Sequence, residues 1–232
     1  MDRHAVIWWR EEIKKAYPNA VLLCETWGDA SRMLGPDGFD CAMNYLFRDA
    51  MIDYFARCSI SENELRIRLN NMLMRYPDQM NHAMYNCLGS HDTARFLTEC
   101  SGEKWKLKLA MAFQMLFPGA PAVYYGDELG MTGENDPGCR GGMVWDHPDQ
   151  DLLDWEKSLI SYRKAHAAVR RGSYETLLAD NDSHVFAFRR SLDSDKIIAV
   201  FNMGKNTYHA DFTESEESVD VQPHSVKIIT KS

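Results

Sequence analysis

Four short apolar runs, each followed by polar or aromatic residues, constrain the fold of this chain more than any other feature. The runs are AVLLCE (20–25), FDCAMNY (39–45), HAMYNCLG (82–89) and PAVYYG (121–126). A short continuous apolar run is typical of a strand that is buried on both faces, and the segments between the runs have a helical hydrophobic period. Residues 1–172 therefore predict alternating helices and strands, which form parallel βα units.

The helical segments have recognisable ends. A first helix is expected to stop at Pro18, and Ser61 with Glu64 forms a capping box at the start of another. Further helices are expected over 104–117 and 150–170. After residue 172 the pattern changes, and HVFAFRRS, KIIAVFNM and SVKIIT read as strands between turns. We therefore expect two domains, an α/β domain over 1–172 and a small antiparallel all-β domain over 173–232.

Composition and charge limit the partners and the location that are expected for the chain. The formal net charge of −8 argues against nucleic acid and anionic membranes as partners. The longest apolar stretch is interrupted by Gln114, Pro118 and Pro121, so no membrane span is expected. The first residues are too polar for a signal peptide, and six cysteines show no C-x-x-C spacing. We expect free cysteines and a cytoplasmic location.

Polar side chains collect where the four predicted strands end. The first run leads into Glu25 and Trp27, the second into Asn44 and Tyr45, the third into Ser90, His91 and Asp92, and the fourth into Tyr125, Asp127 and Glu128. In parallel α/β folds the functional site lies at this edge, so we expect these side chains to converge. Carboxylates, an imidazole, an amide and aromatic rings together favour carbohydrate chemistry.

Each of these residues also has a purely structural interpretation. Glu25 alone is compatible with a salt-bridged strand end, His91 with a structural histidine, and the carboxylates of 127–128 with a helix start. The row Ser90, His91 and Asp92 is not a hydrolytic triad, because neighbours on an extended chain point to opposite faces. The spacings H-E-x-x-H, paired cysteines and the EF-hand are absent, so no metal and no cofactor are expected.

Four segments resemble, in order and spacing, the second half of the α-amylase family (glycoside hydrolase family 13), and in particular its neopullulanase, cyclomaltodextrinase and maltogenic amylase group. They are LLCETWGDA, FDCAMNYLF, NCLGSHDTARFLT and PGAPAVYYGDELGMTGENDPGCRGGMVWD. The resemblance implies the second half of a (β/α)₈ TIM barrel, strands 5–8 with their helices, followed by a small antiparallel β-sandwich domain. It also implies retaining cleavage of α-1,4-glucosidic bonds in maltooligosaccharides, cyclodextrins, pullulan or starch.

The resemblance assigns roles to individual residues. Glu25 is the expected general acid/base, in an apolar setting that suits an acid, and Asp92 is the carboxylate that stabilises the oxocarbenium-like transition state. His91 is expected to hydrogen-bond the sugar at the cleavage subsite. The remaining predicted substrate-binding residues are Trp27, Asn44 and Tyr45 on the acceptor side, Arg95 in the motif of Asp92, and Asp136 and Arg140 in a loop over the donor side.

One component of this chemistry is not found in the sequence. Retaining cleavage needs a nucleophilic carboxylate, which the family carries in a G-F-R-x-D type motif that has no counterpart here, and Asp29, Asp40 and Asp127 are not expected to replace it. The chain is therefore expected to be inactive alone, and its uncovered sheet edges predict a homo-oligomer. A non-catalytic carbohydrate-binding remnant and a doubly wound domain for another small polar ligand remain alternatives.

Overall fold

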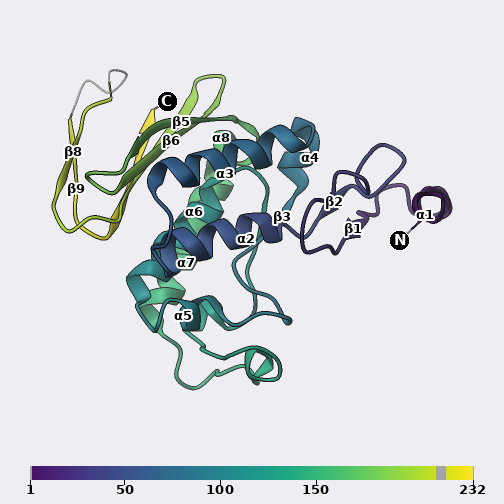
Figure 1. The fold of residues 1–232 in the computed structure, drawn as a ribbon, viewed down its shortest axis with the longest axis horizontal. Coiled ribbons are helices and arrows are strands. Elements are labelled where there is room, and N and C mark those ends of the chain that lie inside the picture. Colours follow the sequence, from purple (N-terminus) through teal and green to yellow (C-terminus); the bar gives the residue numbers. More distant parts are fainter. Residues whose placement is uncertain (1, 213–217, 232) are drawn as a thin grey trace.

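The structure, a computed structural model, describes residues 2–212 and 218–231 (Figure 1). Its helices are α1 (Arg3–Ala16), α2 (Tyr45–Met51), a π-helical turn η1 (Ile52–Ala56), α3 (Glu62–Arg75), α4 (Asp78–Ala83), α5 (Phe96–Glu99), α6 (Lys104–Leu116), the 3₁₀ turns η2 (Asp127–Leu129) and η3 (Gly138–Arg140), α7 (Gln150–Ala165) and α8 (Ala167–Arg171). Its strands are β1 (Leu23–Cys24), β2 (Cys41–Ala42), β3 (Tyr85–Cys87), β4 (Ala120–Ala122), β5 (Ser173–Asp180), β6 (Val185–Leu192), β7 (Asp195–Asn202), β8 (Tyr208–Ala210), β9 (Val219–Val221) and β10 (Ser225–Lys231).

The first four strands are parallel and follow one another in chain order. β1 pairs with β2 and β3 pairs with β4, both in parallel, and a parallel bridge between Met43 and Tyr85 joins the two pairs. A doubly wound sheet reverses its strand order at a switch point, and this sheet does not. The order is that of a barrel segment, so the predicted partial barrel is confirmed and the doubly wound alternative is wrong.

The predicted strands are shorter and less covered than the sequence suggested. Only Leu23 and Cys24 of the run 20–25 are paired, and the side chains of Val21 and Leu23 are 71% and 38% exposed. Among the described residues β1 has a partner on one side only, which is β2. The prediction of a strand buried on both faces is therefore wrong for β1, because burial depends on neighbouring elements and not on the run itself.

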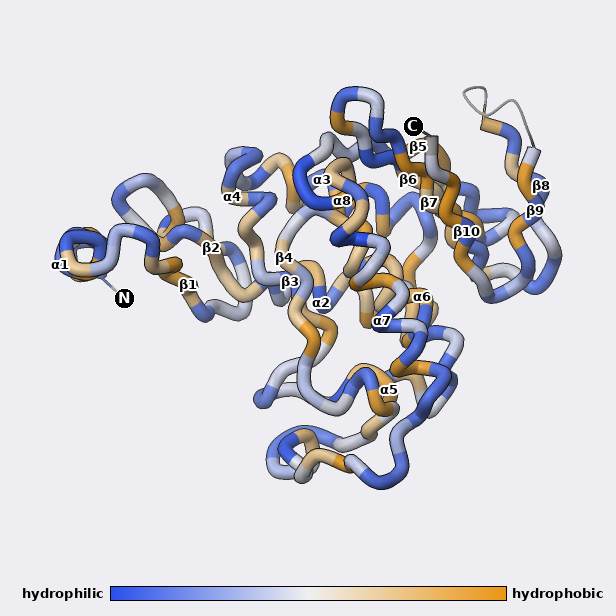
Figure 2. The backbone as a smooth tube through the Cα atoms, turned by 180° about the vertical axis from the view of Figure 1, so that it is seen from behind, coloured by the Kyte–Doolittle hydropathy of each residue, from blue (hydrophilic) through white to orange (hydrophobic). Residues whose placement is uncertain are grey.

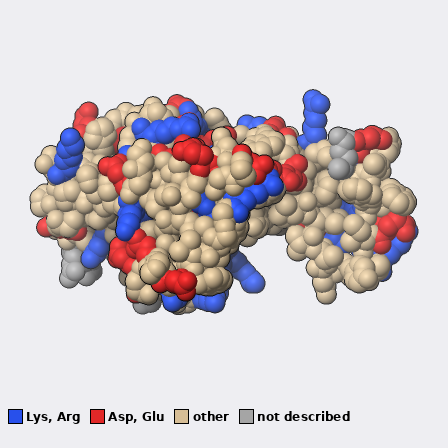
Figure 3. Space-filling view, turned by 90° about the horizontal axis from the view of Figure 1, so that it is seen from below, with Lys and Arg blue, Asp and Glu red and all other residues tan. Residues whose placement is uncertain are grey.

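Helix α1 lies at one end of the molecule (Figure 1). Val6 is its one buried residue, and ion pairs from Arg10 at 2.7 Å and Lys14 at 3.0 Å to Asp40 hold the helix against the start of β2. The predicted stop before Pro18 is confirmed. Figure 3 shows positive and negative side chains interspersed over one face of the molecule rather than segregated.

Capping residues explain where two other helices begin. The Ser61 hydroxyl accepts a hydrogen bond from the Glu64 amide at 3.3 Å, which confirms the predicted start of α3. The single helix predicted over 150–170 is instead two, broken at His166. The Asp195 carboxylate accepts from the Ala168 amide at 2.9 Å and lies 3.3 Å from the His166 imidazole, so a residue of β7 caps α8.

The C-terminal strands form an antiparallel sheet in the order β10-β7-β6-β5, with β8 and β9 as a separate hairpin. Figure 2 shows apolar residues along β6 and β7, where the sheet meets the helices. One hydrophobic core joins the two parts of the chain: Phe113 of α6 lies 5.1 Å from Phe201 and 5.2 Å from Phe188 between ring centroids. The boundary between residues 172 and 173 stays a prediction.

Two further sequence expectations concern the described residues as a whole. No helix within them is long and apolar enough to cross a membrane. All six cysteines are free, and five of them are buried. Burial raises the pKa of Cys87 and of Cys100 to about 12, so these two thiols stay protonated at neutral pH.

Candidate active site

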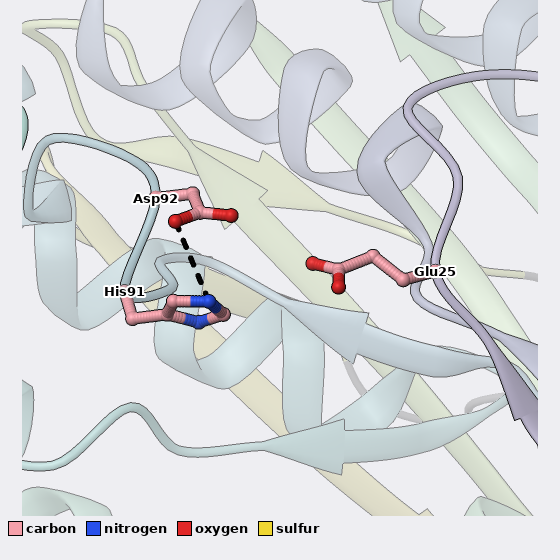
Figure 4. Close-up of side chains that lie close together, drawn as sticks. All are labelled: Glu25, His91 and Asp92. Atoms are coloured by element: carbon pink, nitrogen blue, oxygen red, sulfur yellow. Dashed lines mark ion pairs between the residues drawn. The ribbon is translucent and has the colours of Figure 1, made fainter.

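The carboxyl ends of β1 and β3 bring three predicted functional side chains together (Figure 4). Glu25 directly follows β1, and His91 and Asp92 lie four and five residues beyond β3. One ligand atom of each side chain lies within 4.8 Å of the others, and His91 Nε2 is 3.4 Å from Asp92 Oδ1. All three side chains are exposed, so the apolar enclosure expected around Glu25 is not found.

An aromatic pair forms the floor beside Glu25. The rings of Trp27 and Tyr45 are stacked, with centroids 4.1 Å apart and planes inclined by 19°. Tyr45 is buried, whereas Trp27 is 57% exposed and presents an open ring surface. Burial raises the pKa of Tyr45, so its hydroxyl stays protonated and donates to Glu25 Oε1 at 3.4 Å. Ser90 Oγ, at 3.2 Å from the same hydroxyl, fixes the tyrosine from the other side.

A loop from beyond β4 holds Asp92 and His91 in place. Arg140 Nη2 donates to Asp92 Oδ1 at 3.0 Å, and Arg140 Nε donates to the His91 carbonyl at 2.8 Å. The Asp136 carboxylate lies 3.1 Å from the same guanidinium, and the Cys139 thiol donates to the His91 carbonyl at 3.1 Å. The loop therefore reaches the site through Arg140, while Asp136 orients the arginine.

Asn44 is close to the site in sequence but lies beneath it. Its side chain is buried, its amide nitrogen donates to Asn86 Oδ1 at 2.8 Å, and its oxygen accepts from the Phe47 amide at 3.2 Å as the N-cap of α2. Every one of these partners is internal. The geometry corrects the prediction of a direct substrate contact, because the groups that would bind a sugar are already used.

Arg95 is also buried rather than exposed to a ligand. Its guanidinium forms an ion pair with Asp127 at 2.9 Å, donates to the Tyr125 carbonyl at 2.7 Å, and lies 4.7 Å above the Tyr124 ring. No part of its side chain reaches solvent. The prediction of substrate contact is corrected here too: Arg95 braces the loop after β4 from within.

Two residues of this scaffold were not assigned a role from the sequence. Asn86, in the middle of β3, donates to the Pro118 carbonyl at 2.8 Å and accepts from Asn44, so it ties β3 to its neighbours. Cys139 reaches the carbonyl of His91. A polar residue inside an apolar run was a usable signal for Asn86, whereas Cys139 carries no comparable mark in the sequence.

Two buried acids lie behind the loop. Burial raises the pKa of Asp127 to about 7, although Arg95 acts in the opposite direction. Burial, together with the nearby charges of Glu128 and Asp127, raises the pKa of Glu156 on α7 to about 7. Neither carboxylate oxygen of Glu156 has a hydrogen-bond partner among the described residues. The side chains of both groups are buried.

The cluster of Glu25, His91 and Asp92 is the group of potential metal ligands that the described residues bring together. Asp92 Oδ1 already accepts from Arg140 and lies against His91. An exposed pair of carboxylates beside an imidazole and an open tryptophan ring suits a polyhydroxylated ligand, whose hydroxyls exchange hydrogen bonds while a ring face packs on the indole. The side chains at the strand ends of this partial parallel barrel are thus of the class that carbohydrate-binding sites use.

Comparison with known proteins agrees with this class. Residues 2–161 match the family described as alpha amylase, catalytic domain, and the chain belongs to the alpha-amylase family. A cyclomaltodextrinase from Thermoanaerobacter pseudethanolicus is 43% identical over 204 residues, which cover 87% of this chain and 35% of that protein. An intracellular maltogenic amylase from Bacillus subtilis is 38% identical over 214 residues, which cover 90% and 36%. The chain thus spans about a third of the length of these relatives.

Solved structures support the same fold. A cyclic alpha-maltosyl-(1→6)-maltose hydrolase from Arthrobacter globiformis superposes with a TM-score of 0.95 at 30% identity, covering 100% of this chain and 53% of that one. A solved cyclomaltodextrinase gives a TM-score of 0.87 at 39% identity, covering 90% of this chain and 36% of that one. The predicted partial barrel with a C-terminal β-domain is confirmed.

Proposed function

We propose that this chain carries the acid/base side of a retaining glycoside hydrolase site for α-1,4-glucosidic bonds. The observation that carries the proposal is the convergence of Glu25, His91 and Asp92 from two strand ends, beside the open ring of Trp27 (Figure 4). The names of the relatives, cyclomaltodextrinase and maltogenic amylase, support cyclodextrins and maltooligosaccharides as the substrate class, with pullulan and starch as related α-glucans.

Glu25 has the position required of the general acid/base. Its carboxyl group projects from the end of β1 toward the His91–Asp92 pair, in the space where a glycosidic oxygen would lie (Figure 4). Tyr45 donates to Oε1, which fixes the direction of the carboxyl group and leaves Oε2 free to give a proton to the leaving group. Trp27 packs on the sugar that departs, since its free ring face adjoins Glu25.

Asp92 opposes the positive charge that develops on the sugar ring. Arg140 occupies its Oδ1, which holds the carboxylate in one orientation and leaves Oδ2 toward the substrate. His91 carries exposed ring nitrogens that hydrogen-bond a ring hydroxyl, and two donors from the loop fix its main-chain carbonyl. Preorganised charge of this kind stabilises a transition state more than the ground state.

The chain alone lacks a nucleophile in this proposal. Asp29 is paired with Arg75 at 2.7 Å, Asp40 is held by two cations of α1, and Asp127 is buried against Arg95. Asp92 itself lies close to Glu25, within the ~5 Å that separates a retaining pair. The family resemblance gives Asp92 the stabilising role, however, and the bound Arg140 reduces its nucleophilicity.

The test is the release of reducing sugar from maltotriose and β-cyclodextrin by this chain and by Glu25→Gln. We expect no release from either protein. Release by the parent that Glu25→Gln abolishes would contradict the missing nucleophile and would give that role to another carboxylate of this chain or to one supplied by a second copy. The second candidate function is a non-catalytic carbohydrate-binding remnant, and the exposed face of Trp27 is the observation that supports it. Saccharide binding without turnover, in any longer protein that contains the chain, would favour this candidate.

We also propose that the open side of the partial barrel is covered by a second copy of the chain. Val21, Leu23, Tyr85 and Val123 are exposed apolar side chains in or next to strands β1, β3 and β4. Exposed apolar strands of this kind favour association. Sedimentation at micromolar concentration is expected to show an oligomer, and a monomer would contradict this proposal.

The name of the Bacillus subtilis relative supports an intracellular location.

A further inference from the structure

Ser90 is a buried residue beside the candidate active site whose hydroxyl has no role in the proposed chemistry. It follows the end of β3 by three residues and directly precedes His91 and Asp92. Its exposed fraction is 4%, in contrast to the exposed side chains of the two residues that follow it. A hydroxyl in this position acts through the groups that it holds and not through a direct contact with substrate.

The Ser90 hydroxyl has two hydrogen-bonding neighbours, one on the side of each site carboxylate. Its Oγ accepts from the Asp92 amide at 3.2 Å and lies 3.2 Å from the Tyr45 hydroxyl. Tyr45 in turn donates to Glu25 Oε1 at 3.4 Å. A path of three hydrogen bonds therefore joins the main chain of Asp92 to the carboxyl group of Glu25, and it connects residues that follow three consecutive strands, β1, β2 and β3.

The chemistry of the groups fixes the direction of the hydrogen bonds along this path. The Tyr45 hydroxyl has a single proton, which it donates to Glu25 Oε1. Ser90 must then be the donor in its contact with Tyr45, since a hydroxyl donates once and accepts twice. Its lone pairs remain available to the Asp92 amide. All three bonds thus run toward Glu25, and bonds aligned in this way polarise and strengthen one another.

The turn that carries Ser90 is closed by its own hydrogen bonds. The Ser90 amide donates to Thr93 Oγ1 at 3.0 Å, and the Thr93 amide donates to the Ser90 carbonyl at 3.4 Å. The three bonds of the path itself measure 3.2–3.4 Å and exceed the usual values of about 2.7–3.0 Å. Catalytic hydrogen bonds often have such lengths before the substrate binds, and they shorten in the complex.

The path leaves one oxygen of each carboxylate available. Tyr45 occupies Oε1 of Glu25, and Arg140 occupies Oδ1 of Asp92. Arg140 therefore fixes the side chain of Asp92, whereas Ser90 fixes its main chain. Catalytic groups must be held within about 0.5 Å of their productive positions, so a link between the two carboxylates has a direct use in a site of this kind.

We infer that Ser90 is a positioning residue that holds Glu25 and Asp92 in a fixed arrangement. It acts through the Asp92 amide on one side and through Tyr45 on the other. The inference rests on the proposed function, because it requires that the two carboxylates act on the same glycosidic bond. Without the hydroxyl, the Asp92 amide has lost its acceptor and Tyr45 has lost its donor, and each carboxylate moves independently of the other.

The first test follows the path in the chain itself by ¹⁵N NMR. Tyr45→Phe keeps the aromatic ring and removes the group that accepts the Ser90 proton, so the Asp92 amide resonance should shift by several line widths. In a Ser90→Ala background the same change should have no further effect at Asp92. Tyr162→Phe, the same substitution on α7, is the matched control. An Asp92 amide that Tyr45→Phe leaves in place, or shifts equally in both backgrounds, overturns the inference.

The second test measures turnover in a chimaera, in which this chain replaces the matching segment of the Thermoanaerobacter cyclomaltodextrinase. Ser90→Ala should decrease kcat for β-cyclodextrin about tenfold and change KM by less than about twofold, because the hydroxyl holds catalytic groups and not the substrate. Ser90→Thr keeps a hydroxyl and should recover most of the loss. The double variant Ser90→Ala/Tyr45→Phe should be no slower than the slower single variant, since both changes interrupt one path.

Glu25→Gln in the same chimaera separates this inference from the proposed function. Turnover that Glu25→Gln abolishes and Ser90→Ala leaves unchanged overturns the inference and leaves the proposed function intact. Turnover that Glu25→Gln leaves unchanged contradicts the proposed function, and the inference that rests on it. Losses that add in the Ser90→Ala/Tyr45→Phe double variant overturn the inference, because they show that the two hydroxyls act independently.

Discussion

From the buried carboxyl group of Glu156 we predict how the free energy of unfolding changes with pH. Its side chain is 3% exposed, its two oxygens lack hydrogen-bond partners among the described residues, and burial raises its pKa from 4.5 to about 7. Below about pH 4.5 the carboxyl group is protonated in both the folded and the unfolded chain. As the pH rises toward 7, the unfolded chain ionises first, so the free energy of unfolding decreases with pH.

The size of the effect follows from the two pKa values. A difference between 4.5 and about 7 corresponds to a loss of about 3 kcal/mol above pH 7. Glu156→Gln keeps the shape of the side chain and cannot ionise. The parent should therefore lose about 2.5 kcal/mol more stability than the variant between about pH 5 and about pH 8. Burial also raises the pKa of Asp127 to about 7, and the decrease in stability that this causes is of similar size and common to both proteins.

Urea unfolding at a series of pH values measures this difference. Glu134→Gln, a change of the same chemistry at an exposed position, is the matched control and should follow the parent at every pH. Parallel stability curves for the parent and Glu156→Gln would refute the reasoning, because they would show that burial does not disfavour the ionised carboxyl group at this position.

Two further predictions concern the residues that the structure moves from substrate contact to support. Asn44→Ala removes the N-cap of α2 and leaves Asn86 without its donor. The substitution should lower the free energy of unfolding by about 2 kcal/mol in urea titrations. An unchanged unfolding midpoint would contradict the supporting role. Arg95→Leu leaves Asp127 buried without its cation, and differential scanning calorimetry at pH 8 should show a decrease of about 3–5 kcal/mol in the free energy of unfolding. The decrease should be smaller at pH 5, where Asp127 is protonated. An equal decrease at both pH values would contradict the ion pair.

The location of the site was predictable from the sequence because of a geometric rule. The carboxyl ends of parallel strands meet at one edge of the sheet, so Glu25, His91 and Asp92 had to lie near one another once the strands were recognised. The family resemblance added the roles, which the spacing alone does not give. The structure then added the partners, such as the bond from Arg140 to Asp92.

The burial of individual side chains was not predictable in the same way. Asn44 and Arg95 are polar residues in motifs that carry predicted site residues, and nothing in a linear pattern shows that their side chains turn inward. The same holds for Val21 and Leu23, where an apolar run is left exposed because no element covers it. Local pattern fixes which residues form a strand, and tertiary neighbours decide which of its faces is buried.

The break between α7 and α8 has a comparable origin. The hydrophobic period continues through His166, so the sequence predicts one helix over 150–170. The break depends on Asp195, which lies in β7 and caps the amide of Ala168. A cap supplied from a distant strand leaves no signal near the helix end, and only the folded chain reveals it.

The central claim is that Glu25 is the acid/base of an α-glucan hydrolase site. It is tested most directly by replacing the matching segment of the Thermoanaerobacter cyclomaltodextrinase, 43% identical, with this chain and measuring kcat for β-cyclodextrin. Thermal unfolding of the chimaera and of its Glu25→Gln variant confirms that both are folded. We predict turnover by the chimaera and a decrease of about 10²–10⁴ in kcat for Glu25→Gln. Equal turnover by the two proteins would contradict the account.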